Sequence, residues 1–141
     1  MRIWHIALLP VLPREQLLGQ WRELCLIAKR IRLTGSPGHL LVNWVMDYPP
    51  EHLDYYARAV AAEMKARGYK CNTSRYWQWR TYTSEESVKA KYVFQPKMGP
   101  KYLVQCYMNL DEKSDCGGIA MEDMDRISDL VAEITMMRYA G

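Results

Sequence analysis

Residues 14–33, REQLLGQWRELCLIAKRIRL, contain the pattern that decides the fold. Apolar side chains recur there at helical spacing, which predicts a helix over residues 14–33 with one buried face. That face comprises Leu17, Trp21, Leu24, Ala28 and Ile31. Pro13 stands at a favourable first-turn position, and residues 34–38, TGSPG, end the helix. The charged side chains fall on another face, since residues seven apart return to nearly the same angle; they are Arg22, Glu23, Lys29 and Arg30.

Three further helices are expected along the chain. Pro49 and Pro50 open the second, which continues to a cap at Gly68 and Tyr69. The third spans about residues 101–113, and the fourth spans about residues 121–139 and opens with acidic residues that suit its dipole. Residues 39–48 form either a helical turn or a buried extended segment, and residues 70–99 are the least regular part. Nothing predicts a sheet, so the fold class is all-α: a single compact domain of about four helices with irregular connecting segments.

Composition limits the class of protein. The 141 residues suit a single domain, and no apolar stretch reaches the ~18 residues of a membrane span. We expect a protein that resides in the cytoplasm, because the first residues do not resemble a secretion signal. We also expect a monomer that does not bind a membrane. The four cysteines lack metal-site spacing and are expected to be free thiols, and the three histidines lie far apart. Neither a metal site nor any other cofactor is expected.

Charge is distributed unevenly along the chain. Residues 1–80 hold 12 Lys and Arg against 6 Asp and Glu, whereas residues 81–141 hold 7 against 10. A basic N-terminal half is typical of a nucleic-acid binder, although the same charges can simply solvate the helices.

The N-terminal region brings together an unusual set of reactive groups. The α-amine of Met1 has an ordinary pKa of about 7.7–8.0, so part of it is neutral and nucleophilic at physiological pH. Glu23 supplies a carboxylate and Arg22 a cation that suits phosphate. A neutral amine beside a carboxylate and an arginine is suited to Schiff-base chemistry on a sugar.

Four short motifs, in order, carry a family resemblance. They are Arg2-Ile3, Trp21-Arg22-Glu23-Leu24, the segment Lys65-Ala66-Arg67-Gly68-Tyr69, and Leu110-Asp111-Glu112-Lys113. With one residue inserted between the first two, the chain resembles the phage pyrimidine-dimer DNA glycosylases of the endonuclease V type over residues 1–114. The remaining residues, 115–141, are expected to form an acidic helix that packs on this region and away from DNA.

The resemblance implies an activity and a set of site residues. It implies a DNA glycosylase with abasic-site lyase activity that acts on double-stranded DNA containing a damaged or modified pyrimidine, such as a UV dimer. Met1 would provide the nucleophilic amine, Glu23 the carboxylate and Arg22 a phosphate contact. His5 is a candidate acid or base. The expected DNA-binding residues are Arg2, Arg22, Lys29, Arg30 and Lys113.

Two positions depart from the family pattern. Arg2 follows the initiator methionine where the family exposes a small residue, and the Arg-Ile alignment puts a retained Met1 in that place. Leu26 stands where the family has a second phosphate-contacting arginine, for which Lys29 or Arg30 would compensate.

Several interpretations remain open at this stage. In the stretch from Arg75 to Tyr82, Trp77 or Trp79 either stacks on a base, with Arg75 and Arg80 on phosphates, or packs in the core. Three functions remain open for the whole chain. It is either the glycosylase, or a catalytically silent DNA-binding protein of the same fold, or a small helical interaction module whose acidic fourth helix engages a partner.

Overall fold

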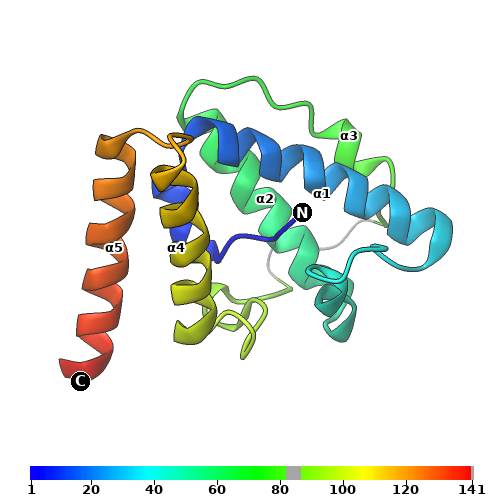
Figure 1. Ribbon diagram of the computed structural model, residues 1–141. Helices are drawn as coiled ribbons and strands as arrows, with labels where there is room; N and C mark the ends of the chain where they lie inside the picture. The colour runs from blue at the N-terminus through cyan, green and yellow to red at the C-terminus, as the bar shows by residue number, and fades with distance from the viewer. Residues whose placement is uncertain (82–86, 141) are drawn as a thin grey trace. The chain divides into compact units, whose positions relative to one another are not determined.

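The computed structural model describes residues 1–81 and 87–140, and it contains helices but no strand in these ranges (Figure 1). The α-helices are α1 (Arg14–Thr34), α2 (Pro50–Ala66), α3 (Ser74–Trp77), α4 (Pro100–Asp115) and α5 (Met121–Ala140). Three 3-10 helices are η1 (Ile6–Val11), η2 (Asn43–Asp47) and η3 (Ala90–Tyr92). The prediction of an all-α fold is confirmed.

The four long helices form where the apolar periodicity predicts them. The predicted face of α1 is buried at Leu17, Trp21, Leu24 and Ala28. At the end of α2, Gly68 takes a φ of +78°, and the Gly68 and Tyr69 amides donate to the Lys65 and Met64 carbonyls. This is a Schellman cap, in which glycine is favoured because a side chain strains a positive φ. The predicted end of the second helix is therefore correct.

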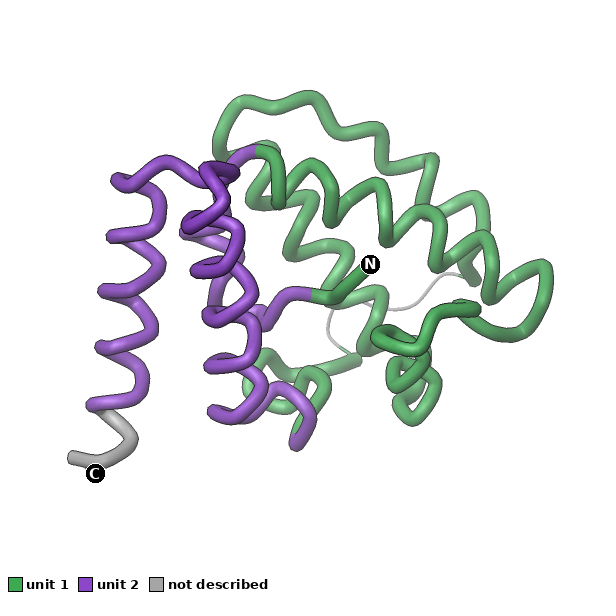
Figure 2. Tube along the Cα trace, viewed as in Figure 1, with its two compact units in different colours: residues 1–3, 15–95 green, residues 4–14, 96–141 purple. Residues whose placement is uncertain are grey.

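The chain divides into two compact units (Figure 2). One comprises residues 1–3 and 15–95, and the other comprises residues 4–14 and 96–141. In the first unit, the buried side chains of α1 and α2 form the core together with Tyr76 and Phe94. In the second, α5 contacts α4 and η1. The single-domain organisation stays a prediction.

The segments that the sequence left open are now defined. Residues 43–47 form η2, so the helical-turn alternative is correct for the segment at 39–48. Within the irregular stretch, the described residues form the short helices α3 and η3. The sequence did not predict η1, which contains Pro10.

Three further observations concern the described residues alone. No helix there is long and apolar enough to cross a membrane. No group of three or more His, Cys, Asp or Glu in those ranges is arranged to hold a metal ion. All four cysteines are free thiols.

Candidate active site

The N-terminal segment of the first unit is fastened to α1 at residue 2. The Arg2 backbone amide donates a long hydrogen bond of 3.4 Å to Oε2 of Glu23. The Arg2 carbonyl accepts a hydrogen bond of 3.0 Å from Nε2 of Gln20. Gln20 and Glu23 are three residues apart on one helix face, so two side chains of α1 hold the backbone amide and the backbone carbonyl of the same residue.

Gln20 is itself positioned from α2. It is 1% exposed, and its Oε1 accepts a hydrogen bond of 2.9 Å from the fully buried Tyr56 hydroxyl. Sequence reasoning did not identify Gln20 as a site residue. The available signal was its position, since Gln20 lies between Leu17 and Leu24 at helical spacing, where an apolar residue is expected. A buried amide there needs polar partners, and the N-terminal segment supplies one of them.

This anchoring limits how far the Met1 amine can lie from Glu23. One residue of chain spans at most ~3.6 Å, so the amine lies within roughly 7 Å of the Glu23 carboxylate, given the 3.4 Å contact at Arg2. Glu23 is half-buried and makes no ion pair within the described ranges. A carboxylate on a helix surface ordinarily pairs with a neighbouring cation, and no described side chain forms such a pair with Glu23.

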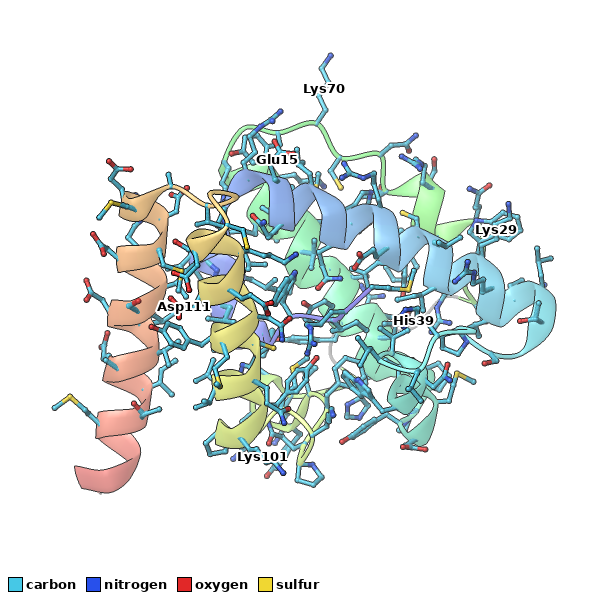
Figure 3. All side chains as sticks on the ribbon, viewed as in Figure 1. Glu15, Lys29, His39, Lys70, Lys101 and Asp111 are labelled. Carbon is cyan, nitrogen blue, oxygen red and sulfur yellow. The ribbon has the colours of Figure 1, made fainter. Side chains whose placement is uncertain are left out.

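A basic pocket lies along α1, and its lining includes Arg22, the residue before Glu23. The pocket has a volume of about 280 Å³, and Arg22, Lys29, Arg75 and Trp79 line it together with Cys25, Leu26 and Gln78. The Lys29 ammonium lies 5.7 Å from the centre of the Trp79 ring, and Figure 3 labels Lys29 on the C-terminal part of α1. Burial raises the pKa of the Cys25 thiol, which disfavours a nucleophilic thiolate there. The pocket thus offers three cations and one aromatic face, which suits phosphate and base contacts.

The second wall of the pocket is held by a buried ion pair. Asp54 of α2 is 0% exposed and accepts 2.6 Å from the Tyr76 hydroxyl and 2.8 Å from Nε of Arg80. Burial raises the pKa of Tyr76 well above its ordinary value, so the hydroxyl stays protonated and can donate. This ion pair favours the packing alternative for Arg80 over a phosphate contact, because the guanidinium would have to leave a buried carboxylate to bind phosphate.

The two tryptophans of this stretch differ in their surroundings. Trp77 packs edge-on against Tyr76 at 4.9 Å and lies under the Arg58 guanidinium at 4.7 Å. These contacts favour the packing interpretation for Trp77. Trp79 instead lines the basic pocket and is the tryptophan available for stacking. Tyr82, which closes the stretch, lies outside the described residues.

His5 belongs to the second unit and is engaged on both ring nitrogens. Nε2 lies 2.8 Å from the Met98 carbonyl, and Nδ1 accepts from the Ala7 amide at 3.1 Å, which caps η1. Burial lowers its pKa and favours the neutral ring. Proton exchange at either nitrogen would break a main-chain hydrogen bond, so we assign His5 a structural role in place of the expected acid–base role.

The remaining expected DNA contacts lie in different surroundings. Arg2 and Arg30 are half-buried in the first unit, where Arg30 donates to the Pro37 carbonyl over a long 3.5 Å. Lys113 is exposed in the last turn of α4, in the second unit. The structure thus brings Arg22 and Lys29 together in one pocket, with Leu26 between them.

Comparison with known proteins identifies one family. The family model for pyrimidine dimer DNA glycosylase matches residues 1–76, which is more than half of the chain. The matched range includes the N-terminal segment, α1 and α2, and therefore Gln20, Glu23 and Asp54. No curated protein and no solved structure matches the chain.

Proposed function

Because the chain belongs to the pyrimidine dimer DNA glycosylase family, we propose that it excises a damaged or modified pyrimidine from double-stranded DNA and then cleaves the abasic site. The proposed nucleophile is the α-amine of Met1. Glu23 exchanges protons with the reacting sugar, and Arg22 and Lys29 of α1 bind the phosphates beside it. The family assignment favours this proposal over a helical interaction module.

The first step is displacement of the base. The neutral Met1 amine forms a bond to C1′ of the sugar, and the glycosidic bond breaks with its electron pair leaving on the base. The new C1′–N group loses a proton, and the sugar ring opens to an imine as O4′ gains one. Glu23 can accept and return protons at this position because its carboxylate lies beside residue 2.

The second step is strand cleavage. A proton leaves C2′ of the imine, and the C3′–O bond breaks with its electron pair leaving on the phosphate. Water then hydrolyses the imine and returns the free amine. Arg22 and Lys29 stabilise the phosphate charge, since charge-assisted hydrogen bonds to phosphate are among the strongest that side chains make.

The single observation that carries this proposal is the fastening of residue 2 to α1. A flexible N-terminus would place its amine at random, whereas Gln20 and Glu23 restrain the residue next to it. Lys29 lines the same pocket as Leu26, which supports the idea that it supplies the cation missing at that position.

Borohydride trapping on a duplex with one abasic site tests the proposal. Reduction of the imine should leave a covalent complex of protein and DNA, and mass spectrometry of its peptides should locate the link at Met1. Chemical acetylation of the N-terminus should abolish the adduct. Intact mass of the purified protein checks that Met1 is retained, since its loss would pass the role to Arg2.

Three outcomes would contradict parts of the proposal. An adduct that survives N-terminal acetylation would move the nucleophile to a lysine. Salt-dependent DNA binding without any adduct would leave a DNA-binding protein that lacks the chemistry. Arg22→Ala should weaken binding and reduce the salt slope by about one phosphate contact, and an unchanged slope would remove Arg22 from the interface.

A further inference from the structure

One exposed apolar side chain stands on a turn that several internal hydrogen bonds hold. Leu40 is 86% exposed, the largest exposed fraction among the large apolar side chains that the structure describes. It lies next to Leu41, which is 45% exposed, and near Met46, which is 47% exposed. A single exposed leucine is ordinary, but three exposed apolar side chains within residues 40–46 suggest an interaction surface.

The turn at residues 39–43 is rigid by its hydrogen bonds. The Val42 and Asn43 amides both donate to the His39 carbonyl, at 3.1 and 2.9 Å. The His39 side chain accepts from the Leu41 amide at 3.2 Å, and the Asn43 side chain accepts from the His39 amide at 3.2 Å. Leu40 therefore sits on a turn whose flanking amides are satisfied internally, so it can be presented at little entropic cost.

An aromatic cluster of Trp44, Tyr48 and Phe94 contacts this turn. The Trp44 indole donates 3.0 Å to the Leu41 carbonyl, and its ring meets Phe94 edge-on at 4.9 Å. Phe94 has a φ of +54°, which is strained for a residue with a side chain. Its backbone is held there by a hydrogen bond to the His52 ring at 2.9 Å and one from the Tyr48 hydroxyl at 3.2 Å.

The same cluster contacts Tyr56, which positions a residue of the candidate active site. Phe94 packs against Tyr56 at 6.2 Å between ring centres, and Tyr56 binds the Gln20 that fastens residue 2. The turn and the candidate active site thus share one packed support within the first unit.

The turn is attached to α1 on the flank that carries Glu23. Arg30 donates to the Pro37 carbonyl, and its Cδ lies 3.8 Å from where a Cβ of Gly38 would be. Glu23 and Arg30 are seven residues apart, so they lie on nearly the same face, separated by about 10.5 Å along the axis. Figure 3 labels His39, which begins the turn, and Lys29, the neighbour of Arg30 on α1.

We infer that Leu40 is an apolar wedge that enters the base stack of duplex DNA beside the nucleotide extruded toward Glu23. DNA is the occupant that fits because the C-terminal part of α1, which leads into the turn, carries Lys29, Arg30 and Arg32, and cations there can meet phosphates. Of these, Arg30 donates to Pro37, two residues before the turn begins. Proteins that unstack bases insert leucine, isoleucine or methionine between them and kink the duplex. This inference rests on the proposed function, since it assumes that a nucleotide is drawn out of the stack.

The test measures base unstacking without chemistry. The probe is a duplex with a tetrahydrofuran abasic analogue, which cannot form an imine, and with 2-aminopurine beside it. Wild-type protein should brighten the 2-aminopurine and bind this duplex more tightly than intact duplex. Leu40→Ala should lose the brightening and lower that preference by roughly tenfold or more. Leu33→Ala removes another exposed leucine (63% exposed) as a matched control, and Leu40→Met restores an apolar wedge.

A second measurement separates the wedge from the active site. Borohydride trapping on a single-stranded abasic oligonucleotide needs no unstacking, so Leu40→Ala should trap there as fast as wild type. Three results would each overturn the wedge. The first is equal brightening by Leu40→Ala and Leu33→Ala, and the second is no brightening by wild type. The third is a loss of single-stranded trapping in Leu40→Ala that equals its loss on duplex. Failure of wild type to trap on single strands, with brightening intact, would instead refute the proposed chemistry and leave the wedge standing.

Discussion

Gln20→Leu tests whether the fastened N-terminus is needed for catalysis. Leucine keeps most of the volume but removes the acceptor of the Tyr56 hydroxyl and the donor to the Arg2 carbonyl. Depriving a buried hydroxyl of its acceptor costs about 1–3 kcal/mol. At an unfolding entropy of about 2.1 cal/mol/K per residue, that loss lowers the Tm of a chain of 141 residues by roughly 3–10 °C.

The double variant Gln20→Leu/Tyr56→Phe separates stability from positioning. Removing the hydroxyl together with the Gln20 acceptor should recover most of the lost Tm, because the group that would need that acceptor is gone as well. It should leave borohydride trapping as slow as in Gln20→Leu, because the Arg2 carbonyl still lacks its donor. Tyr56→Phe alone keeps that donor and should trap faster than either variant.

The assay is single-turnover trapping on an abasic duplex, at a temperature where every variant is fully folded by circular dichroism. We expect the trapping rate to fall in the variants that lack the Gln20–Arg2 contact. We expect the Tm to fall most in the variant that keeps the Tyr56 hydroxyl but lacks its Gln20 acceptor. Trapping by Gln20→Leu at the wild-type rate would refute the reasoning that Gln20 positions the amine.

Three further predictions concern the proposed carboxylate, the buried ion pair and acid stability. Glu23→Gln should lower turnover by on the order of 10²-fold with unchanged DNA affinity, and full activity on lesion and abasic substrates would contradict the family-based role. Asp54→Ala should lower the free energy of unfolding in urea by about 3–5 kcal/mol because its arginine partner is buried, whereas Asp123→Ala, at an exposed pair, should cost less than ~1 kcal/mol. Burial lowers the pKa of His5 below 6.5, so the unfolded chain binds the proton first and stability should fall as pH drops below about 6.5. His5→Gln should flatten that fall in urea midpoints measured from pH 7.5 to 5, with a remainder from His52, whose pKa burial also lowers; an unchanged slope would show that His5 does not contribute.

The helices were predictable because their information is local. Apolar spacing over residues 14–33 and the glycine at position 68 specify where α1 and α2 lie and where α2 ends. By contrast, η1 contains Pro10 and is capped by His5, which also contacts Met98, 93 residues away. A contact at that separation leaves no periodic signal in the sequence.

The candidate site was predictable only in part for the same reason. Arg22 and Lys29 are seven residues apart and therefore lie on the same face of α1, so the sequence alone groups them. Gln20 was missed because its role depends on Arg2 and on Tyr56, which lies 36 residues away. The role of Arg80 stayed open because its partner Asp54 lies 26 residues earlier, and basic residues beside tryptophans suit a nucleic-acid contact as well as packing.

The buried pair at Asp54 has a kinetic consequence for the pocket. Helix α3 is four residues long, and isolated helices shorter than ~12–15 residues are marginal in water. Its position therefore depends on contacts of Tyr76 and Arg80 with Asp54, 22 and 26 residues away, so we expect this wall to assemble after α1 and α2 and to open before they unfold. Amide exchange of α3 should then be faster than that of the two long helices, and a molecule with intact α1 and α2 can still, for part of the time, lack one side of its basic pocket.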